Sequence, residues 1–240
     1  MGNQIGDTGR TTRAPAVVVR LPGLNINLSG VLAVVPITIA LAFTLLLVYL
    51  IYRTSQQLLW LSAVLWILFI GYWNAAAGNT GKTRTSESVH SRQVHQLLMY
   101  GALVLAFVRV PGLNGRWLPR SPWIIAAGFA IQLSSALLAI RARKHLGLNW
   151  SAEVASKVDH QLVRSGPYRL IRHPIYTGML GMFVGTAVVS GELHGLAAVV
   201  LISVAYFRKI RLEEQNLGNV FGAQYDEYKD KSWALIPWLI

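Results

Sequence analysis

Long apolar segments constrain the fold of this chain more than any other feature of its sequence. Six apolar runs lie at roughly 31–52, 58–78, 94–110, 122–140, 175–190 and 193–207. The first two reach the ~20 residues that an α-helix needs to cross the hydrocarbon core of a bilayer, and the fourth is nearly as long. Only 13% of the residues are charged and 53% are apolar, whereas a soluble domain carries about 25% charged residues. The sequence therefore predicts an integral membrane protein.

The last two runs predict a helical hairpin. Each is about sixteen residues long, and only Ser190, Gly191 and Glu192 separate them, which is typical of two antiparallel helices joined by a short turn. Gly178, Gly181 and Gly185 lie on one side of the fifth run, and small residues at this spacing predict close packing between the two hairpin helices. The predicted fold is an all-α membrane protein of about six hydrophobic helices. It divides into an arm at 1–30, four transmembrane helices at 31–140 and a C-terminal region at 141–240 that contains the hairpin.

Basic residues orient the predicted helices. If all six runs cross the membrane, eighteen of the 22 Lys and Arg residues lie on the side that holds both termini and the loop 141–173. Cytoplasmic loops carry such an excess of positive charge, so we expect a multi-pass protein with both termini in the cytoplasm, in the inner (plasma) membrane if the source is a bacterium. The net charge of +12 favours contact with anionic membrane lipids and gives no support to nucleic-acid binding, because the basic residues flank the apolar runs.

Several common kinds of site lack their sequence signals. The arm 1–30 has no continuous apolar core, so it does not resemble a signal peptide. The chain has no cysteine, which excludes disulfides and thiolate catalysis, and its six histidines do not form the spaced pairs of a zinc site. G-x-S-x-G, Walker and G-x-G-x-x-G motifs are all missing from the sequence, so serine-hydrolase, ATP and Rossmann chemistry are not indicated.

Two polar clusters interrupt the apolar pattern in the C-terminal half. Residues 162–178 read LVRSGPYRLIRHPIYTG, and residues 208–215 read RKIRLEEQ. Pro167 and Pro174 restrict the first cluster, which lowers the entropy cost of ordering it around a ligand. A hairpin between the clusters would bring them together, so they predict one pocket for a charged ligand at the bilayer surface. We expect the apolar and aromatic C-terminal segment to shield Glu213 and Glu214 from bulk water.

The segment GPYRLIRHPIYTG, followed 35 residues later by EEQNLGNVFGAQYDEYKDKSWALIP, resembles the isoprenylcysteine carboxyl methyltransferase family and its phospholipid methyltransferase relatives. The resemblance covers residues 146–237. It implies a methyltransferase that uses S-adenosyl-L-methionine and takes a lipophilic acceptor from the bilayer. The cofactor-binding positions that it implies are His160, Leu162, Gly166, Tyr168, Arg172, His173, Pro174, Tyr176, Glu213 and Glu214. Among these, Arg172, His173 and Glu214 are the candidate catalytic residues.

The residue types suit that cofactor. Carboxylates at Glu213 or Glu214 match its ammonium or its ribose hydroxyls, and Arg172 matches its carboxylate. Tyrosine faces attract a sulfonium cation by ~0.5–2 kcal/mol. Methyl transfer is an in-line displacement, so catalysis consists largely of positioning the reactants and excluding water.

A carboxylate is the expected acceptor group. A carboxylic acid of pKa ~4 is already ionised at neutral pH, whereas an alkylammonium of pKa ~10 must first lose a proton. Arginine, which dominates the first cluster, cannot accept that proton near neutral pH. The alternatives that remain open are a phospholipid N-methyltransferase, an NADPH-dependent membrane reductase of the sterol type, and a non-enzymatic scaffold that binds lipid.

Overall fold

The computed structural model describes residues 18–21, 24–27, 58–77, 83–151, 155–157 and 161–238. The chain divides into two units, residues 1–46 and residues 47–240. In the first unit, strand β1 (Val18–Leu21) pairs antiparallel with strand β2 (Leu24–Asn27). The predicted apolar run at 31–52 and most of the predicted arm lie outside the described residues.

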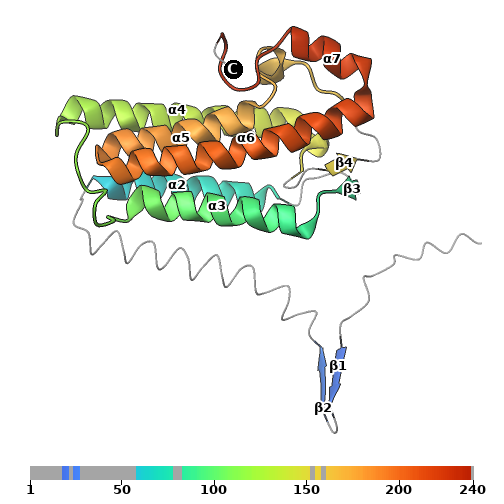
Figure 1. Ribbon diagram of the computed structural model, residues 1–240, viewed down its shortest axis with the longest axis horizontal. Helices are drawn as coiled ribbons and strands as arrows, with labels where there is room; N and C mark the ends of the chain where they lie inside the picture. Colours follow the sequence, from blue (N-terminus) through green and yellow to red (C-terminus); the bar gives the residue numbers. More distant parts are fainter. Residues whose placement is uncertain are drawn as a thin grey trace, which may run out of the picture. The chain divides into compact units, whose positions relative to one another are not determined.

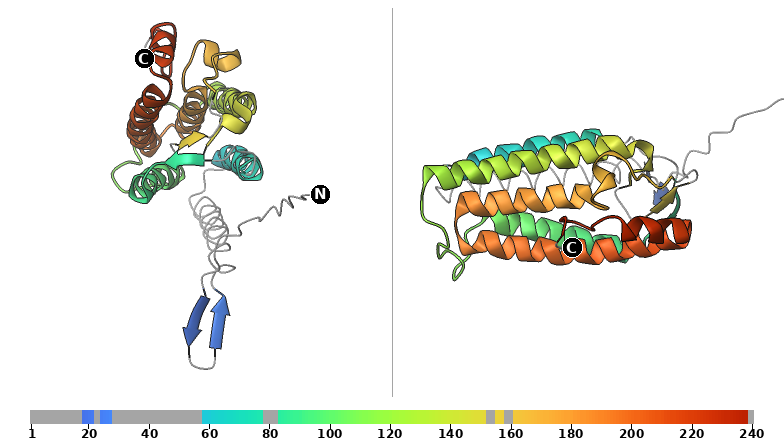
Figure 2. Two further views of the ribbon diagram at one scale, coloured as in Figure 1. Left: turned by 90° about the vertical axis from the view of Figure 1, so that its right-hand side faces the viewer. Right: turned by 90° about the horizontal axis from the view of Figure 1, so that it is seen from above.

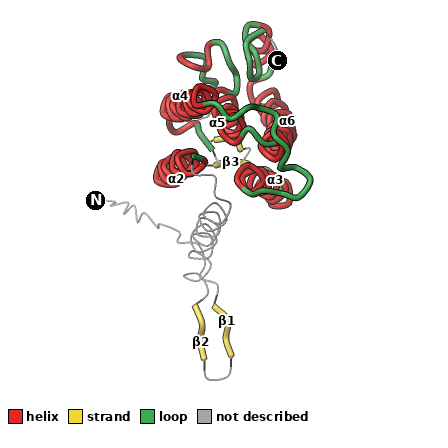
Figure 3. Tube along the Cα trace, turned by 90° about the vertical axis from the view of Figure 1, so that its left-hand side faces the viewer, coloured by secondary structure: helices red, strands yellow, loops and turns green. Residues whose placement is uncertain are grey.

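The second unit is built on five helices that run side by side (Figures 1 and 2). They are α2 (Leu59–Ala75), α3 (Val89–Phe107), α4 (Pro122–Leu146), α5 (Pro174–Ser190) and α6 (Leu193–Phe221). Each corresponds to one of the five remaining predicted runs. Helices α4, α5 and α6 form one layer, and α2 and α3 form a second layer against it (Figure 3).

The predicted all-α architecture needs one correction within the described residues of this unit. Strand β3 (Thr83–Ser86) pairs antiparallel with strand β4 (Ala155–Lys157). This short ladder connects the segment before α3 to the segment after α4. These strands could not be predicted from the sequence, because strands of three and four mostly polar residues carry no alternating apolar pattern.

Helix length and composition agree with a membrane location. Among the described residues, the helical segments Pro122–Asn149 and Leu193–Phe221 are long and apolar enough to cross a bilayer, and α2 and α5 are shorter apolar helices. Helix α6 has 29 residues and is therefore about 43 Å long, which exceeds the ~30 Å hydrocarbon core. Its apolar first half lies within the core, and its polar second half extends from the core to the membrane surface.

Helices α4 and α5 pack backbone to backbone. A Cβ atom added at Gly185 would lie 2.6 Å from the carbonyl oxygen of Gly128, and one added at Gly178 would lie 2.6 Å from that of Ser135. The glycines of α5 therefore face α4, and the prediction that they mediate contact with α6 was wrong. The contact between α5 and α6 depends instead on Gly195, whose added Cβ would lie 2.8 Å from the Cα of Ala187.

A buried polar network joins three helices within the bundle. The Ser62 hydroxyl donates to Gln132 Oε1 at 2.7 Å, and the Gln132 amide donates to the carbonyl of Ser62 at 3.0 Å. The Trp66 indole donates to the Thr186 hydroxyl at 3.0 Å. Because every member finds a partner, these contacts link α2 to α4 and α5 without leaving unpaired polar groups in an apolar core.

The loop between α3 and α4 is clamped onto the turn between α5 and α6. Glu192 in that turn is buried, and its Oε2 atom lies 3.1 Å from Arg109 Nε and 3.4 Å from His194 Nε2. The Trp117 amide donates to the carbonyl of Gly191 at 3.0 Å. These contacts close one end of the bundle, and the two polar clusters lie at the other end (Figure 1).

Candidate functional site

The first polar cluster begins with a tight turn that requires glycine. The 3-10 helix η2 (Gly166–Arg169) starts at a residue with φ +58°, a left-handed conformation that residues with a side chain rarely adopt. A Cβ atom at Gly166 would also lie 2.7 Å from the His145 ring. His145 Nε2 lies 2.9 Å from the Ser165 hydroxyl, so the turn is fixed to the end of α4.

The C-terminal segment pairs with this loop. The backbone amides of Arg172 and His173 donate to the carbonyls of Trp233 and Ala234 at 2.8 and 3.0 Å, and the Trp233 amide donates to the carbonyl of Leu170 at 3.0 Å. Helix α7 (Ala223–Asp230) leads into this segment. Its Tyr228 hydroxyl donates to the carbonyl of Tyr168 at 2.5 Å. Burial raises the pKa of Tyr228 to about 12, so this hydroxyl remains a donor across the physiological range.

The Arg172 side chain joins the loop, α6 and the C-terminal segment. Its Nε atom donates to Glu214 Oε1 at 2.8 Å, and its Nη1 atom donates to the carbonyl of Lys229 at 3.2 Å and to the carbonyl of Ser232. The Arg172 side chain is 11% exposed and that of Glu214 is 18% exposed. Arg172 therefore acts in this structure as a clamp as well as a cavity-lining residue.

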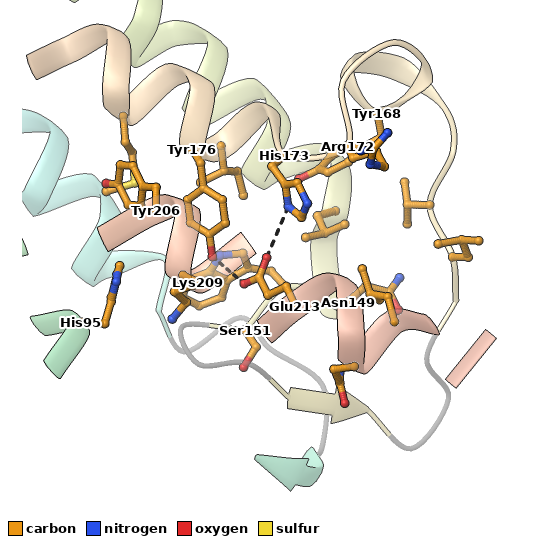
Figure 4. A pocket seen from close by; sticks show the side chains of 18 of the residues that line it. His95, Asn149, Ser151, Tyr168, Arg172, His173, Tyr176, Tyr206, Lys209 and Glu213 are labelled. Atoms are coloured by element: carbon orange, nitrogen blue, oxygen red, sulfur yellow. Dashed lines mark hydrogen bonds and ion pairs between the residues drawn. The ribbon is translucent and has the colours of Figure 1, made fainter. Parts of the chain in front are cut away.

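Glu213 and Glu214 both contact His173. His173 Nδ1 lies 3.4 Å from Glu213 Oε2, and His173 Nε2 lies 3.3 Å from Glu214 Oε1. The Tyr176 hydroxyl donates to Glu213 Oε1 at 2.5 Å, and Figure 4 shows both of the Glu213 contacts. Burial alone would lower the pKa of His173, but the hydrogen bonds to the two glutamates outweigh burial and raise it. The imidazolium form is thereby stabilised between two carboxylates.

A cavity of about 340 Å³ lies between the loop and the helices, which is within the range of small-molecule sites. Six of the sequence-predicted residues line it: Leu162, Tyr168, Arg172, His173, Tyr176 and Glu213. Gly166, Pro174 and Glu214 are not among its lining residues; Gly166 shapes the loop, Pro174 begins α5 and Glu214 bonds to Arg172. His160 lies outside the described residues.

Other cavity residues were not anticipated from the sequence. His95 comes from α3, and Tyr206 and Lys209 come from α6. Trp73 lies near the end of α2, and Trp150 lies in the segment that follows α4. The Arg143 guanidinium stacks 3.4 Å from the centre of the Trp150 ring and donates to the carbonyl of Ala76 at 2.6 Å. This contact fixes the aromatic wall of the cavity.

The spacing along α6 is the signal that could have revealed part of this wall. Tyr206, Lys209 and Glu213 are separated by three and four residues, and residues at such intervals share one face of a helix. All three line the cavity (Figure 4). The cavity therefore combines an acidic group, aromatic faces and basic groups, a set that can bind a ligand carrying both cationic and anionic parts. In the part of the chain that the structure describes, no group of three His, Asp or Glu side chains is placed to hold a metal ion.

Comparison with known proteins gives a consistent result. Residues 123–224 match the family model for phospholipid methyltransferases. The chain is 30% identical over 151 residues to protein-S-isoprenylcysteine O-methyltransferase A of Arabidopsis thaliana, which covers 60% of this chain and 70% of that protein. A stretch of 71 residues, 30% of this chain and 24% of the relative, is 39% identical to methanethiol S-methyltransferase 1 of Bradyrhizobium diazoefficiens.

A solved structure shares the fold. It is that of the eukaryotic intramembrane Ras methyltransferase isoprenylcysteine carboxyl methyltransferase, with a TM-score of 0.50 and 24% sequence identity. The match covers 61% of this chain, and this chain spans about half of that one, 53%.

The helical bundle with its polar cavity and the methyltransferase relatives together define the class: this is an integral membrane methyltransferase. The chain belongs to the family of isoprenylcysteine carboxyl methyltransferases and phospholipid methyltransferases. The resemblance predicted from the two polar clusters is thereby confirmed.

Proposed function

We propose that the protein transfers a methyl group from S-adenosyl-L-methionine to the carboxylate of a lipophilic acceptor at the cytoplasmic surface of the membrane. The observation that carries this proposal is the position of Glu213. Its carboxylate lies in the wall of the cavity, where Tyr176 and His173 hold it. The loop beside it lies within residues 123–224, which match the phospholipid methyltransferase family model.

The residues of the cavity fit this cofactor. Glu213 is an acceptor for its ammonium or its ribose hydroxyls. The faces of Tyr176 and Tyr206, stacked with their centroids 5.0 Å apart, offer π-density to a sulfonium cation. Trp73, Trp150 and Met179 provide apolar surface for an adenine ring. The volume of about 340 Å³ suits a ligand of this size better than the much larger NADPH dinucleotide of the alternative reductase.

When bound, S-adenosyl-L-methionine supplies an electrophilic methyl group. Glu213 and the tyrosines orient it, and the C-terminal segment paired to the loop excludes water from the site. In this transfer the acceptor's carboxylate oxygen would form the bond to the methyl carbon, and the electron pair of the broken carbon–sulfur bond would stay on sulfur. No proton moves in this step, so the site needs no general base. His173 lies between two carboxylates that raise its pKa and stabilise its protonated form, so it is poorly suited to be one.

Binding of the cofactor is tested by calorimetry on the purified protein in detergent, with S-adenosylhomocysteine and with NADPH in separate titrations. We expect binding of the first only. Glu213→Gln should weaken it ten- to a hundredfold, because a charge-assisted hydrogen bond contributes ~1.5–3 kcal/mol. Glu227→Gln is the matched control, since Glu227 is an exposed carboxylate of α7 bonded to Lys231. Binding of NADPH and not of S-adenosylhomocysteine would refute the proposal.

The acceptor is tested with methyl-labelled cofactor and a membrane lipid extract. A methyl ester releases labelled methanol in mild alkali, whereas an N-methyl amine does not. Release of the label supports the carboxylate acceptor, and alkali-stable label in a lipid amine would favour phospholipid N-methylation instead.

A further inference from the structure

Three of the polar side chains that line the cavity outside the motif loop come from α3 and α6. His95 comes from α3, and Tyr206 and Lys209 come from α6 (Figure 4). They are 8%, 1% and 3% exposed. His95 and Lys209 have no role in the cofactor binding proposed above. Tyr206 has one, because its ring face contacts the sulfonium, but its hydroxyl has none.

Two of these cavity-lining residues carry buried polar atoms without a hydrogen-bond partner. In the described part of the chain, the Tyr206 hydroxyl and the His95 Nδ1 atom are buried and have no hydrogen-bond partner. The two rings are neighbours, with their centroids 5.9 Å apart. Buried polar atoms are nearly always hydrogen-bonded in native proteins, so two neighbouring exceptions in one cavity wall indicate a ligand that supplies the missing partner.

Lys209 adds an ammonium group to this wall, held in an ion pair with Glu87. Its ammonium lies 3.5 Å from Glu87 Oε1, and the Ser91 hydroxyl donates to Glu87 Oε2 at 2.7 Å. Arg208 in turn donates to the Ser91 hydroxyl at 2.8 Å. These contacts hold α6 against the start of α3, so the ammonium is positioned before any ligand arrives. A preorganised cation beside two neutral hydrogen-bonding groups suits an anion and disfavours an alkylammonium.

Helical geometry separates this wall from the acidic one. Lys209 and Tyr206 precede Glu213 by four and seven residues on the same face of α6, which corresponds to about 6 and 10 Å along the axis. One cavity therefore has an acidic end at Glu213 and a basic end at Tyr206 and Lys209. A cationic methyl donor at the first and an anionic acceptor at the second would be close enough for direct transfer.

We infer that His95, Tyr206 and Lys209 form the subsite that binds the carboxylate of the methyl acceptor. This inference rests on the proposed function and assigns its substrate-recognition residues. One carboxylate oxygen accepts from Tyr206 and Lys209, and the other attacks the methyl carbon as the carbon–sulfur bond breaks toward sulfur. The acceptor is thus selected by its anionic group and not by its chain alone.

The test uses the full-length protein in detergent, saturated with S-adenosylhomocysteine. Calorimetry measures the affinity for N-acetyl-S-farnesylcysteine and for the analogue that carries a primary amide in place of the carboxylate. We expect the carboxylate to bind at least about tenfold more tightly than the amide. Equal affinities, or no binding of the carboxylate, would overturn the inference.

The variants Tyr206→Phe and His95→Leu remove the two unpaired polar atoms. Each should weaken binding of the carboxylate about tenfold or more with an intact thermal transition, and His95→Leu should leave the affinity for S-adenosylhomocysteine unchanged. Tyr225→Phe is the matched control, because the Tyr225 hydroxyl is also buried and unpaired in the described structure but does not line the cavity. It should leave the affinity for the carboxylate unchanged.

The outcomes separate this inference from the proposed function. Loss of S-adenosylhomocysteine affinity in His95→Leu would assign this group to the cofactor and overturn the inference, while the proposed function stands. Failure of the wild-type protein to bind S-adenosylhomocysteine would refute the proposed function. The titrations with the carboxylate and the amide, repeated without S-adenosylhomocysteine, would then still decide whether the subsite recognises an anion.

Discussion

The clamp formed by Arg172 allows a quantitative prediction for Arg172→Lys. The guanidinium makes one hydrogen bond to Glu214 and two to the carbonyls of Lys229 and Ser232. A lysine ammonium can replace the contact with Glu214 but cannot reproduce the forked geometry. Each charge-assisted bond contributes ~1.5–3 kcal/mol, and the released carbonyls recover part of that by bonding water. We expect docking of the C-terminal segment to weaken by about 2 kcal/mol, or roughly thirtyfold.

Hydrogen exchange measures this docking directly. The amides of Arg172, His173 and Trp233 are the ones that bond the loop to the C-terminal segment, so their exchange should accelerate by roughly thirtyfold in Arg172→Lys. Lys231→Gln is the control. Lys231 lies only 2.6 Å from Glu227, but the two side chains are 69% and 58% exposed, and such surface pairs contribute little. Unchanged exchange in Arg172→Lys, or equal acceleration in the control, would refute the reasoning.

Three further predictions concern packing, pH and topology. Gly185→Leu should destabilise the bundle by about 1–3 kcal/mol, because even a Cβ atom would lie 2.6 Å from the carbonyl oxygen of Gly128. Gly218→Ala is the control: nothing lies within 4 Å of an added Cβ there, so this variant should not lower the temperature of the thermal transition. The raised pKa of His173 means that its ion pairs contribute fully below the unfolded value of ~6.5, and that this stability is lost as pH rises through the folded pKa. Thermal stability should therefore fall above neutral pH more steeply in the wild type than in His173→Gln, and parallel curves would contradict this assignment. Reporter fusions at the C-terminus and within residues 109–120 should report opposite sides of the membrane, as expected from the distribution of Lys and Arg; the same side for both would contradict the predicted orientation.

Apolar runs predicted the helices but not their partners. Length and composition are enough to indicate a membrane helix, and all five described runs are helices. Which face of α5 meets which neighbour depends on shape complementarity between helices that are all apolar, and the glycine spacing of α5 is compatible with either neighbour. The prediction that Gly181 and Gly185 face α6 failed for this reason.

The adjacent glutamates Glu213 and Glu214 show which parts of the site can be predicted from the sequence of α6. Successive residues on a helix point about 100° apart, so Glu213 and Glu214 point to different sides of α6. Glu213 lines it, whereas Glu214 bonds to Arg172. Periodicity could have predicted this division and the alignment of Tyr206, Lys209 and Glu213. It could not have predicted His95, because the register between α3 and α6 is set by tertiary contacts such as those of Arg208 with Ser91.

The pairing of the motif loop with the C-terminal segment has a consequence for the order of events during synthesis. The ribosome completes the loop at residues 162–178 before it makes α6, and the partner strand around Trp233 follows only after α6 and α7. A nascent chain that stops within α6 contains the loop but lacks the carbonyls that hold Arg172 and His173. The helices can therefore enter the membrane before a closed site exists, and the cavity wall is completed among the last steps of folding.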